Sequence, residues 1–242
     1  MLDKNFLTSV EAVFRHAQII DLSHDLVEGI PKFPTHSSYK HIPAQHSNDP
    51  AVMFRLEIHE HSGTHVDAPI HLLTDTLNFQ SHAPTVDGIG LGHLIGIATL
   101  VCIEKNAGEL VTKQDLEVWQ EKKGLRIDTP IVLFNFGWHK KWSAGDSGEA
   151  FVNGWPGLSK EATNFLLDAG VKAVGTDCLG MDSHDSHDYP AHDILLKNNI
   201  LIIENLKYYE DLPNRFFFIA LPLNIFGGSG SPIRAIGLVE RK

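Results

Sequence analysis

Cysteine, long apolar segments and excess positive charge are all scarce in this 242-residue chain. Its two cysteines, Cys102 and Cys178, cannot provide the disulfide framework of a small secreted protein, and they do not form a metal-type pair. No apolar run approaches the roughly 18 residues that a membrane span requires. With 20 Lys and Arg against 30 Asp and Glu, the chain also lacks the basic character that nucleic acid binding requires. We therefore expect neither a membrane nor a nucleic acid as a partner.

The first residues contain neither the basic segment nor the apolar stretch of a signal peptide, so we expect a cytoplasmic protein. The composition is that of an ordinary globular protein, with 43% hydrophobic and 21% charged residues. No repeat, low-complexity tract or flexible linker divides the chain, so residues 1–242 are predicted to form a single domain. Histidine is unusually abundant, with 15 residues. Because histidine is the commonest protein metal ligand, the positions of these residues direct the functional prediction.

Helix-starting patterns occur at several places along the chain. A Thr-Ser-Val-Glu capping box at residues 8–11 precedes apolar residues at helical spacing and predicts a helix near the N-terminus. Ser or Thr caps and terminal glycines predict two more helices, over residues 112–124 and 159–170. A shorter helix is expected over residues 191–197.

Strand-like segments are interleaved with these helices. Residues 52–58 alternate between apolar and polar side chains, which predicts a half-buried strand; His59 continues its polar face and is interpreted as structural. Because strands and helices do not follow a strict βαβ alternation, we predict an α/β fold with a mixed β-sheet or partly closed β-barrel flanked by helices, of the swivelling β/β/α-like type. Further strands are predicted over residues 19–22, 95–104, 131–136, 171–177, 200–203, 216–221 and 233–239.

The densest group of chemically active side chains follows the strand at residues 52–58. Side chains alternate in an extended chain, so His65 and Asp67 are expected on one face, and a small turn around Gly63 can bring His61 beside them. Two imidazoles and one carboxylate are a common ligand set for a catalytic divalent metal. His71 follows nearby and is not paired by this pattern. The alternative is a solvated histidine-rich loop, or buried histidines bonded to the backbone.

A second cluster, at residues 175–193, has many residues of the types that bind metals, but its pattern does not select among them. Asp185, His187 and Asp188 are interpreted as a solvated acidic loop, whereas His192 opens the helix predicted at residue 191. Glu204 directly follows a buried strand, and a carboxylate there is costly unless it is paired or binds a metal. The alternative for Glu204 is a strand end exposed to solvent.

These motifs resemble the cyclase family of metal-dependent hydrolases, which includes bacterial kynurenine formamidases and isatin hydrolases. The most specific resemblance is the segment His-Ser-Gly-Thr-His-Val-Asp-Ala-Pro-Ile-His at residues 61–71. Weaker similarities extend over most of the chain, at residues 21–24, 29–34, 136–138, 156–159, 174–177, 204–206 and 230–235.

The resemblance implies a role for each matching position. His61, His65 and Asp67 correspond to metal ligands, and His71 corresponds to the residue that acts as acid and base. In the two-zinc formamidases a later histidine and a glutamate twelve residues beyond it complete the site. His192 and Glu204 match this spacing. The cofactor implied is one or two Zn²⁺ ions, with Mn²⁺ as the alternative because isatin hydrolases bind manganese in a related site.

The same comparison places Phe33 at the position of a substrate-facing tryptophan in the formamidases, which keeps an aromatic wall without an indole N–H. Trp138 or Phe226 is a further candidate for this wall. The resemblance implies a hydrolase that cleaves an amide bond of a small, aromatic substrate, like an arylformamidase, and that assembles as a homodimer or homotetramer. The alternatives are an isatin-hydrolase-type lactam or lactone hydrolase, a polyketide cyclase, and a non-catalytic protein that binds a metal or ligand.

Overall fold

A computed structural model of the chain describes residues 4–45, 50–72 and 83–241. A mixed nine-stranded sheet runs through this part of the chain in the order β1-β13-β11-β5-β7-β9-β10-β4-β12. The sheet curls into a half-barrel, which confirms the predicted mixed, partly closed α/β architecture. Its strands are β1 Ala17–Asp21, β4 His65–Asp67, β5 Ile95–Cys102, β7 Ile131–Asn135, β9 Ala173–Thr176, β10 Leu201–Glu204, β11 Arg215–Ile219, β12 Gly230–Pro232 and β13 Ile236–Glu240.

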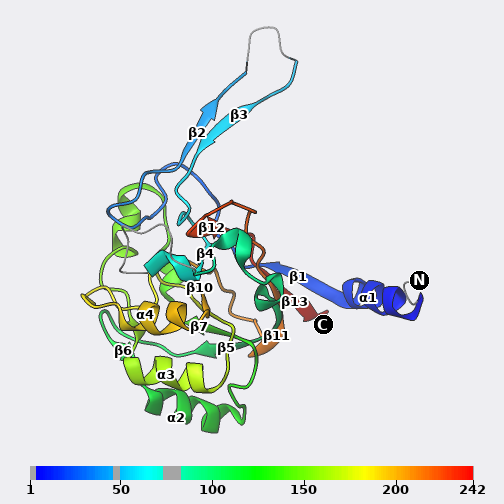
Figure 1. The fold of residues 1–242 in the computed structure, drawn as a ribbon, viewed down its shortest axis with the longest axis vertical. Coiled ribbons are helices and arrows are strands. Elements are labelled where there is room, and N and C mark those ends of the chain that lie inside the picture. The colour runs from blue at the N-terminus through cyan, green and yellow to red at the C-terminus, as the bar shows by residue number, and fades with distance from the viewer. Residues whose placement is uncertain (1–3, 46–49, 73–82, 242) are drawn as a thin grey trace.

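Helices α2, α3 and α4 pack against the body of the sheet, whereas α1 and the β2–β3 pair extend away from it (Figure 1). Two further strand pairs join β2 to β3 and β6 to β8. None of the described helices is long and apolar enough to span a membrane. The helices are α1 Lys4–His16, α2 Lys113–Lys123, α3 Lys160–Asp168 and α4 Pro190–Lys197, and the additional strands are β2 Lys40–Pro43, β3 Phe54–Glu57, β6 Leu110–Val111 and β8 Gly157–Leu158.

The caps of α2 and α3 are those that the sequence predicts. Thr112 and Asp115 form a reciprocal capping box, and α2 ends at Gly124, whose φ of 60° suits glycine. The Ser159 side chain accepts a hydrogen bond from the Ala162 amide at the start of α3. The local sequence therefore sets where both helices start and where α2 ends.

The two faces of the central strands bury two separate apolar clusters. On β7, Val132 and Phe134 face the cluster that includes the apolar sides of α2, α3 and α4, whereas Leu133 faces the other cluster. On β4, Val66 likewise faces away from the helices, so the residues on either side of it point towards α4. This alternation places His65 and Asp67 on one face, as the sequence predicts.

Register in the sheet brings distant parts of the sequence together. Strand β4 pairs antiparallel with β10, and His65 lies directly opposite Glu204. On its other side β4 pairs with β12, where Gly230 lies opposite Asp67. Strand β4 thus lies between two strands that are each more than a hundred residues further along the chain.

The predictions for the N-terminal helix and for residues 52–58 need correction. Helix α1 begins at Lys4, earlier than the capping box at residues 8–11 predicts, and its apolar residues are exposed. Strand β3 forms a hairpin with β2 that projects from the body of the protein (Figure 1). Val52 is 75% exposed and Phe54 49% exposed, so the prediction of a half-buried strand is wrong. The alternating pattern is real, but the described chain provides no core for its apolar face.

Candidate metal centre and adjoining cavity

Five buried side chains from four parts of the chain meet beside β4. One group of possible ligand atoms comprises His61, His65 and Asp67, and a second comprises Asp67, His192 and Glu204. Within each group the ligand atoms lie within 4.8 Å of one another, and every one of these residues is buried. The structure therefore brings together all five residues that the resemblance implies as ligands.

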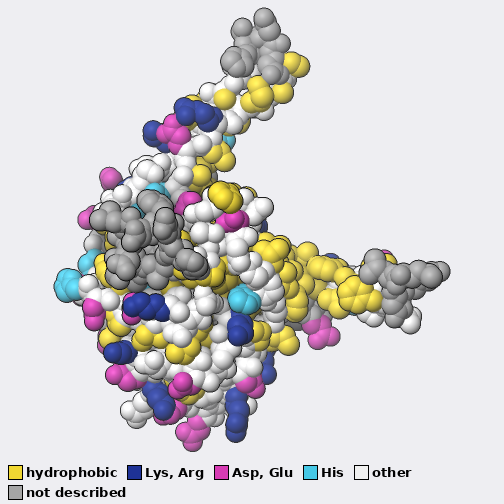
Figure 2. Space-filling model, viewed as in Figure 1, with side chains coloured by type: hydrophobic (Ala, Val, Ile, Leu, Met, Phe, Trp, Pro, Cys, Tyr) yellow, Lys and Arg dark blue, Asp and Glu magenta, His cyan; other side chains and the backbone are white. Residues whose placement is uncertain are grey.

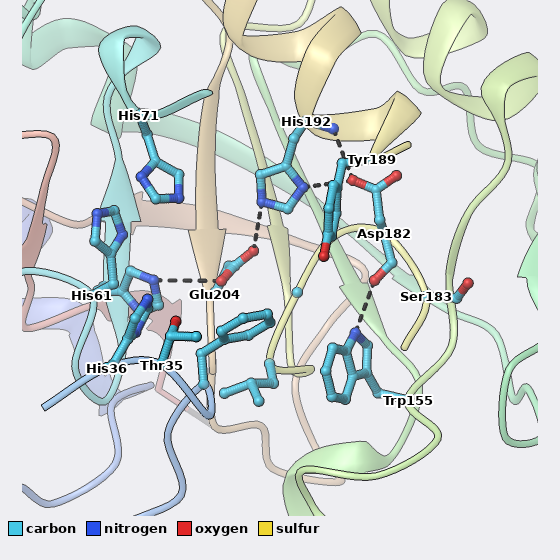
Figure 3. Close-up of a pocket in the computed structure, with 14 residues that line it drawn as sticks. Thr35, His36, His61, His71, Trp155, Asp182, Ser183, Tyr189, His192 and Glu204 are labelled. Carbon is cyan, nitrogen blue, oxygen red and sulfur yellow. Dashed lines mark hydrogen bonds and ion pairs between the residues drawn. The ribbon is translucent and has the colours of Figure 1, made fainter. Parts of the chain in front are cut away.

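Asp67 and Glu204 occupy the centre of this cluster. The Oδ1 atom of Asp67 lies 2.6 Å from Nδ1 of His61 and 3.4 Å from Nε2 of His65. Glu204 lies between two histidines, 3.4 Å from Nε2 of His65 and 3.2 Å from Nε2 of His192 (Figure 3). Nε2 of His192 is also 3.7 Å from Asp67 Oδ2. Two carboxylates and three imidazoles thus converge on one small volume.

Hydrogen bonds behind the cluster set the orientation of two of these rings. Nδ1 of His65 lies 2.9 Å from the Gly63 carbonyl oxygen, which also accepts a hydrogen bond from the side-chain amide of Asn205. Nδ1 of His192 lies 2.6 Å from Asp182 Oδ2. In both cases the ring nitrogen that faces the carboxylates is Nε2, the atom that could bind a metal in place of a proton, as in metal sites whose ligands are held by an outer layer of hydrogen bonds.

His61 is held differently. Its Nδ1 faces Asp67, while its Nε2 lies 3.0 Å from the Ser229 hydroxyl, which donates to Glu60 at 2.7 Å. The ring also lies flat against Gly230. A Cβ atom at that glycine would be 2.8 and 2.9 Å from the two ring nitrogens and closer still to the carbon between them. Gly230 is therefore required for the position of His61.

The pKa shifts of the clustered side chains show that the site stabilises positive charge beside its carboxylates. Burial opposes ionisation of His65, but its hydrogen bonds to Asp67 and Glu204 outweigh burial and raise its pKa to about 10. Burial also opposes charge on His192, yet Asp182 and Glu204 raise its pKa well above the usual value. The carboxylates stay ionised: although burial acts to raise the pKa of Asp67, the nearby imidazoles of His71 and His61 hold it well below its ordinary range.

Asp67 supplies the observation that tests whether a metal fits. Its Oδ2 atom is buried and has no hydrogen-bond partner among the described residues. A buried carboxylate oxygen without a hydrogen bond destabilises the folded protein unless a cation binds beside it. Histidine nitrogens and carboxylate oxygens are ligands of Zn²⁺ and of Mn²⁺ alike. The residues present therefore fit a divalent metal, and they do not select between these two.

His71 lies next to the cluster and takes no part in either ligand group. It is on a short 3₁₀ turn, Pro69–Leu72, that follows β4, and its ring packs against that of His61 at a tilt of 32°, with 3.9 Å between centroids. Burial lowers the pKa of His71 to about 4, and the opposing effect of Asp67 is smaller. The imidazole is therefore neutral near pH 7 and can accept a proton.

A cavity of about 210 Å³ opens onto the cluster (Figure 3). Phe33 lies on its wall together with Trp155 and Leu179. No Lys or Arg is among the described residues that line it. Its neutral polar side chains, other than histidines, belong to Thr35, Ser183 and Tyr189. The cavity is thus suited to an uncharged, flat ligand with few polar groups.

Some expectations about this region are wrong, and some side chains were missed. Trp138 is buried, with its indole N–H bonded to the Phe151 carbonyl oxygen, and Phe226 is 94% exposed, so neither is a cavity wall. Trp155 is the tryptophan that lines the cavity. Its indole N–H donates to the backbone carbonyl oxygen of Asp182, which fixes the ring there. No sequence pattern marks Trp155, Asp182 or Ser229. Glu60 and Asn205 are marked only by their adjacency to His61 and Glu204.

Comparisons with known proteins agree with this arrangement. The family model Cyclase, described as "Putative cyclase", matches residues 20–183. A kynurenine formamidase of Salinibacter ruber is 34% identical over 185 residues, which are 75% of this chain and 77% of that protein. An isatin hydrolase of Roseibium aggregatum is 29% identical over 239 residues, which are 92% of this chain and 87% of that protein.

The fold is also that of a solved relative. The crystal structure of an isatin hydrolase bound to the product analogue thioisatinate matches with a TM-score of 0.87 and 24% identity, and the match covers 100% of both chains. The family model spans more than half of the chain, and the motif at residues 61–71 lies within it. The chain therefore belongs to the cyclase family.

Proposed function

We propose that this protein is a metal-dependent hydrolase that cleaves a carbon–nitrogen amide bond in a small aromatic molecule, in the manner of an arylformamidase. The observation that carries the proposal is the buried cluster in which Asp67 Oδ2 has no hydrogen-bond partner among the described residues while three imidazoles and Glu204 surround it. The relatives named kynurenine formamidase and isatin hydrolase support hydrolysis of such a bond.

Two ligand sets are proposed. His61, His65 and Asp67 would hold a first ion, and His192 with Glu204 would hold a second, with Asp67 shared between them. Zn²⁺ is proposed first and Mn²⁺ second. A divalent ion here would polarise the substrate carbonyl and make a bound water more acidic.

The remaining residues then have separate tasks. His71, neutral near pH 7 and beside the cluster, takes a proton from the attacking water and returns it to the leaving nitrogen. Phe33 and Trp155 hold an aromatic ring, since both line the cavity that opens onto the cluster. The outer carboxylate of Asp182 keeps Nε2 of His192 directed at Glu204.

An isatin-hydrolase-type activity on a lactam is the second candidate. No Lys or Arg is among the described residues of the cavity to pair with an anionic substrate tail, which favours a neutral bicyclic amide. A polyketide cyclase would use the same metal site. A non-catalytic binding protein is less well supported, because it has no need for an unliganded neutral histidine such as His71 beside the ion.

One experiment tests these proposals together. The purified protein is analysed for metal content, stripped with a chelator, and reloaded separately with Zn²⁺ and Mn²⁺. Each form is assayed on N-formyl anilines, isatin-like lactams and aromatic lactones. We expect one or two ions per chain, hydrolysis of at least one amide class, and loss of turnover on stripping that reloading restores. Full activity in the stripped protein would contradict the mechanism.

Gly230 offers a more specific test of the His61 position. In the variant Gly230→Ala the new methyl group would overlap the His61 ring and move its Nδ1 away from Asp67. We expect metal affinity to fall about 10- to 100-fold, the size of effect seen when the surroundings of a ligand are disturbed. Affinity is measured by competition with a chromophoric chelator. The control is Gly92→Ala, because a Cβ at Gly92 would have no atom within 4 Å; equal affinities in the two variants would contradict the role of Gly230.

We also propose that residues 1–242 form one domain that assembles as a homodimer or homotetramer. Two arms extend from the body, namely α1 and the β2–β3 hairpin (Figure 2), and both expose apolar side chains. A two-stranded ribbon or a single 13-residue helix is marginally stable alone in water. A second copy related by a two-fold axis would cover the same arms in both chains at once.

The assembly proposal predicts the effect of charges on the hairpin. The double variant Phe54→Glu, Leu56→Glu places two carboxylates on its exposed apolar face, and we expect the dimer dissociation constant to rise at least about tenfold. Light scattering after size-exclusion chromatography measures the mass of each species. Phe226→Glu is the control, since Phe226 is 94% exposed and lies outside both arms. A wild-type protein that is monomeric at high concentration would contradict this proposal.

A further inference from the structure

Tyr189 has a backbone conformation that its residue type rarely adopts. Its φ of 44° and ψ of 52° lie in the left-handed region, and the other non-glycine residues with positive φ in the described chain are two asparagines, which tolerate this region better. Pro190 follows directly and further disfavours helical-type angles in the residue before it. Strain of this kind in a bulky residue is found mainly where function requires it.

The surrounding structure holds this conformation in place. The Tyr189 amide donates to the Ser186 hydroxyl at 3.2 Å, and its carbonyl oxygen accepts from the Asp193 amide at 3.0 Å in the first turn of α4. The Asp182 carboxylate accepts bonds from the next two amides, those of Ala191 and His192. The turn that orients His192 in the metal cluster therefore also determines where the Tyr189 side chain points.

That side chain points into the cavity. Tyr189 lines it together with Phe33 and Trp155, and its ring meets His192 edge-on, with 6.3 Å between centroids. Figure 3 shows its hydroxyl oxygen directed towards the space between Glu204 and Trp155. The side chain is not buried, since Tyr189 is 39% exposed, and the hydroxyl has no hydrogen-bond partner among the described residues. A donor is thus held at the wall of a largely apolar cavity, available to a ligand.

We infer that Tyr189 contacts the substrate and selects for it: its hydroxyl donates a hydrogen bond to an acceptor oxygen carried by the aromatic ring system, in addition to the amide that is cleaved. The identity of the cleaved bond rests on the proposed function. The hydrogen bond from Tyr189 to a bound ligand does not depend on it. The hydroxyl therefore favours ligands that carry such an acceptor over ligands of the same shape that lack it. A phenylalanine at residue 189 would keep the wall and lose this preference.

Two non-hydrolysable probes test the contact. Ortho-aminoacetophenone carries a ring-borne carbonyl, whereas ortho-ethylaniline has a similar shape without it. Their affinities for the metal-loaded wild-type protein and for Tyr189→Phe are measured by isothermal titration calorimetry. We expect the variant to bind ortho-aminoacetophenone about three- to tenfold more weakly, the size of one neutral hydrogen bond, and ortho-ethylaniline within about twofold of wild type. The control is Tyr209→Phe, a tyrosine outside this cavity.

A second variant separates substrate contact from a structural role. Tyr189→Asn places a residue that accepts left-handed angles at this position, so we expect thermal stability at least equal to wild type but weaker binding of both probes. Equal losses for the two probes in Tyr189→Phe, no loss for either, or failure of both to bind the wild-type protein would overturn the inference. Because neither probe has a bond to cleave, a lack of amide hydrolysis would contradict the proposed function and leave this comparison valid.

Discussion

Replacement of His65 by alanine is expected to remove the metal. Nε2 of His65 lies 3.4 Å from both Asp67 and Glu204, so this one imidazole contacts the carboxylates of both ligand groups. Loss of a direct ligand should weaken binding by more than the about 10- to 100-fold that follows from disturbing an outer hydrogen bond. We therefore expect less than about a tenth of an ion per chain after purification, and turnover close to background. Metal content is measured by mass spectrometry of the purified protein, and affinity by chelator competition.

The control for this variant is a histidine outside the cluster. His93 lies on a separate 3₁₀ turn, Leu91–Leu94, so His93→Ala should keep the wild-type metal content. Circular dichroism of both variants shows whether the fold is intact, which matters because His65→Ala leaves two buried carboxylates facing each other. A folded His65→Ala protein with a full complement of metal would show that the ligand assignment is wrong.

The contiguous half of the site is predictable because its geometry is local. In an extended chain, residues two apart lie on the same side, and this rule alone places His65 beside Asp67. The same rule explains why Val66 faces the opposite apolar cluster. His192 and Glu204 are different: their approach to Asp67 depends on how β10 pairs with β4 and on where α4 starts. The sequence shows that His192 and Glu204 are twelve residues apart, but only the family resemblance identifies this spacing as that of a ligand pair.

The parts that escaped prediction depend on long-range packing. Ser229 contacts Nε2 of His61 and donates to Glu60, which lies 169 residues earlier in the chain. Glu60 is marked only by its adjacency to His61, and no pattern marks Ser229. Trp155 and Trp138 both follow a glycine in the sequence. The indole of Trp155 donates to the Asp182 carbonyl oxygen and lines the cavity, whereas that of Trp138 donates to the Phe151 carbonyl oxygen and is buried elsewhere. The alternation at residues 52–58 correctly predicts a strand, β3, but periodicity cannot show whether its apolar face meets a core of the same chain.

The second large effect is expected for His71→Ala, which should retain its metal and lose most of its turnover. The His71 ring belongs to neither group of ligand atoms, and it contacts the site by packing against the His61 ring, with 3.9 Å between centroids. Removing an acid–base residue typically reduces turnover about 10²- to 10⁴-fold, so kcat should fall by this factor while metal content stays at the wild-type level. Both are measured on one preparation, with a substrate identified in the amide and lactam screen.

The combination of these two readouts distinguishes proton transfer from support of the metal site. If His71 served mainly to pack against His61, its loss would lower metal affinity, and added metal would restore turnover. If it transfers protons, saturating metal restores nothing, and a small base such as imidazole in the assay should recover part of kcat by entering the space left by the ring. His71→Gln is the matched variant, because it fills much of that space without providing a titratable nitrogen. Turnover within about threefold of wild type in His71→Gln would contradict the assignment of His71 as acid and base.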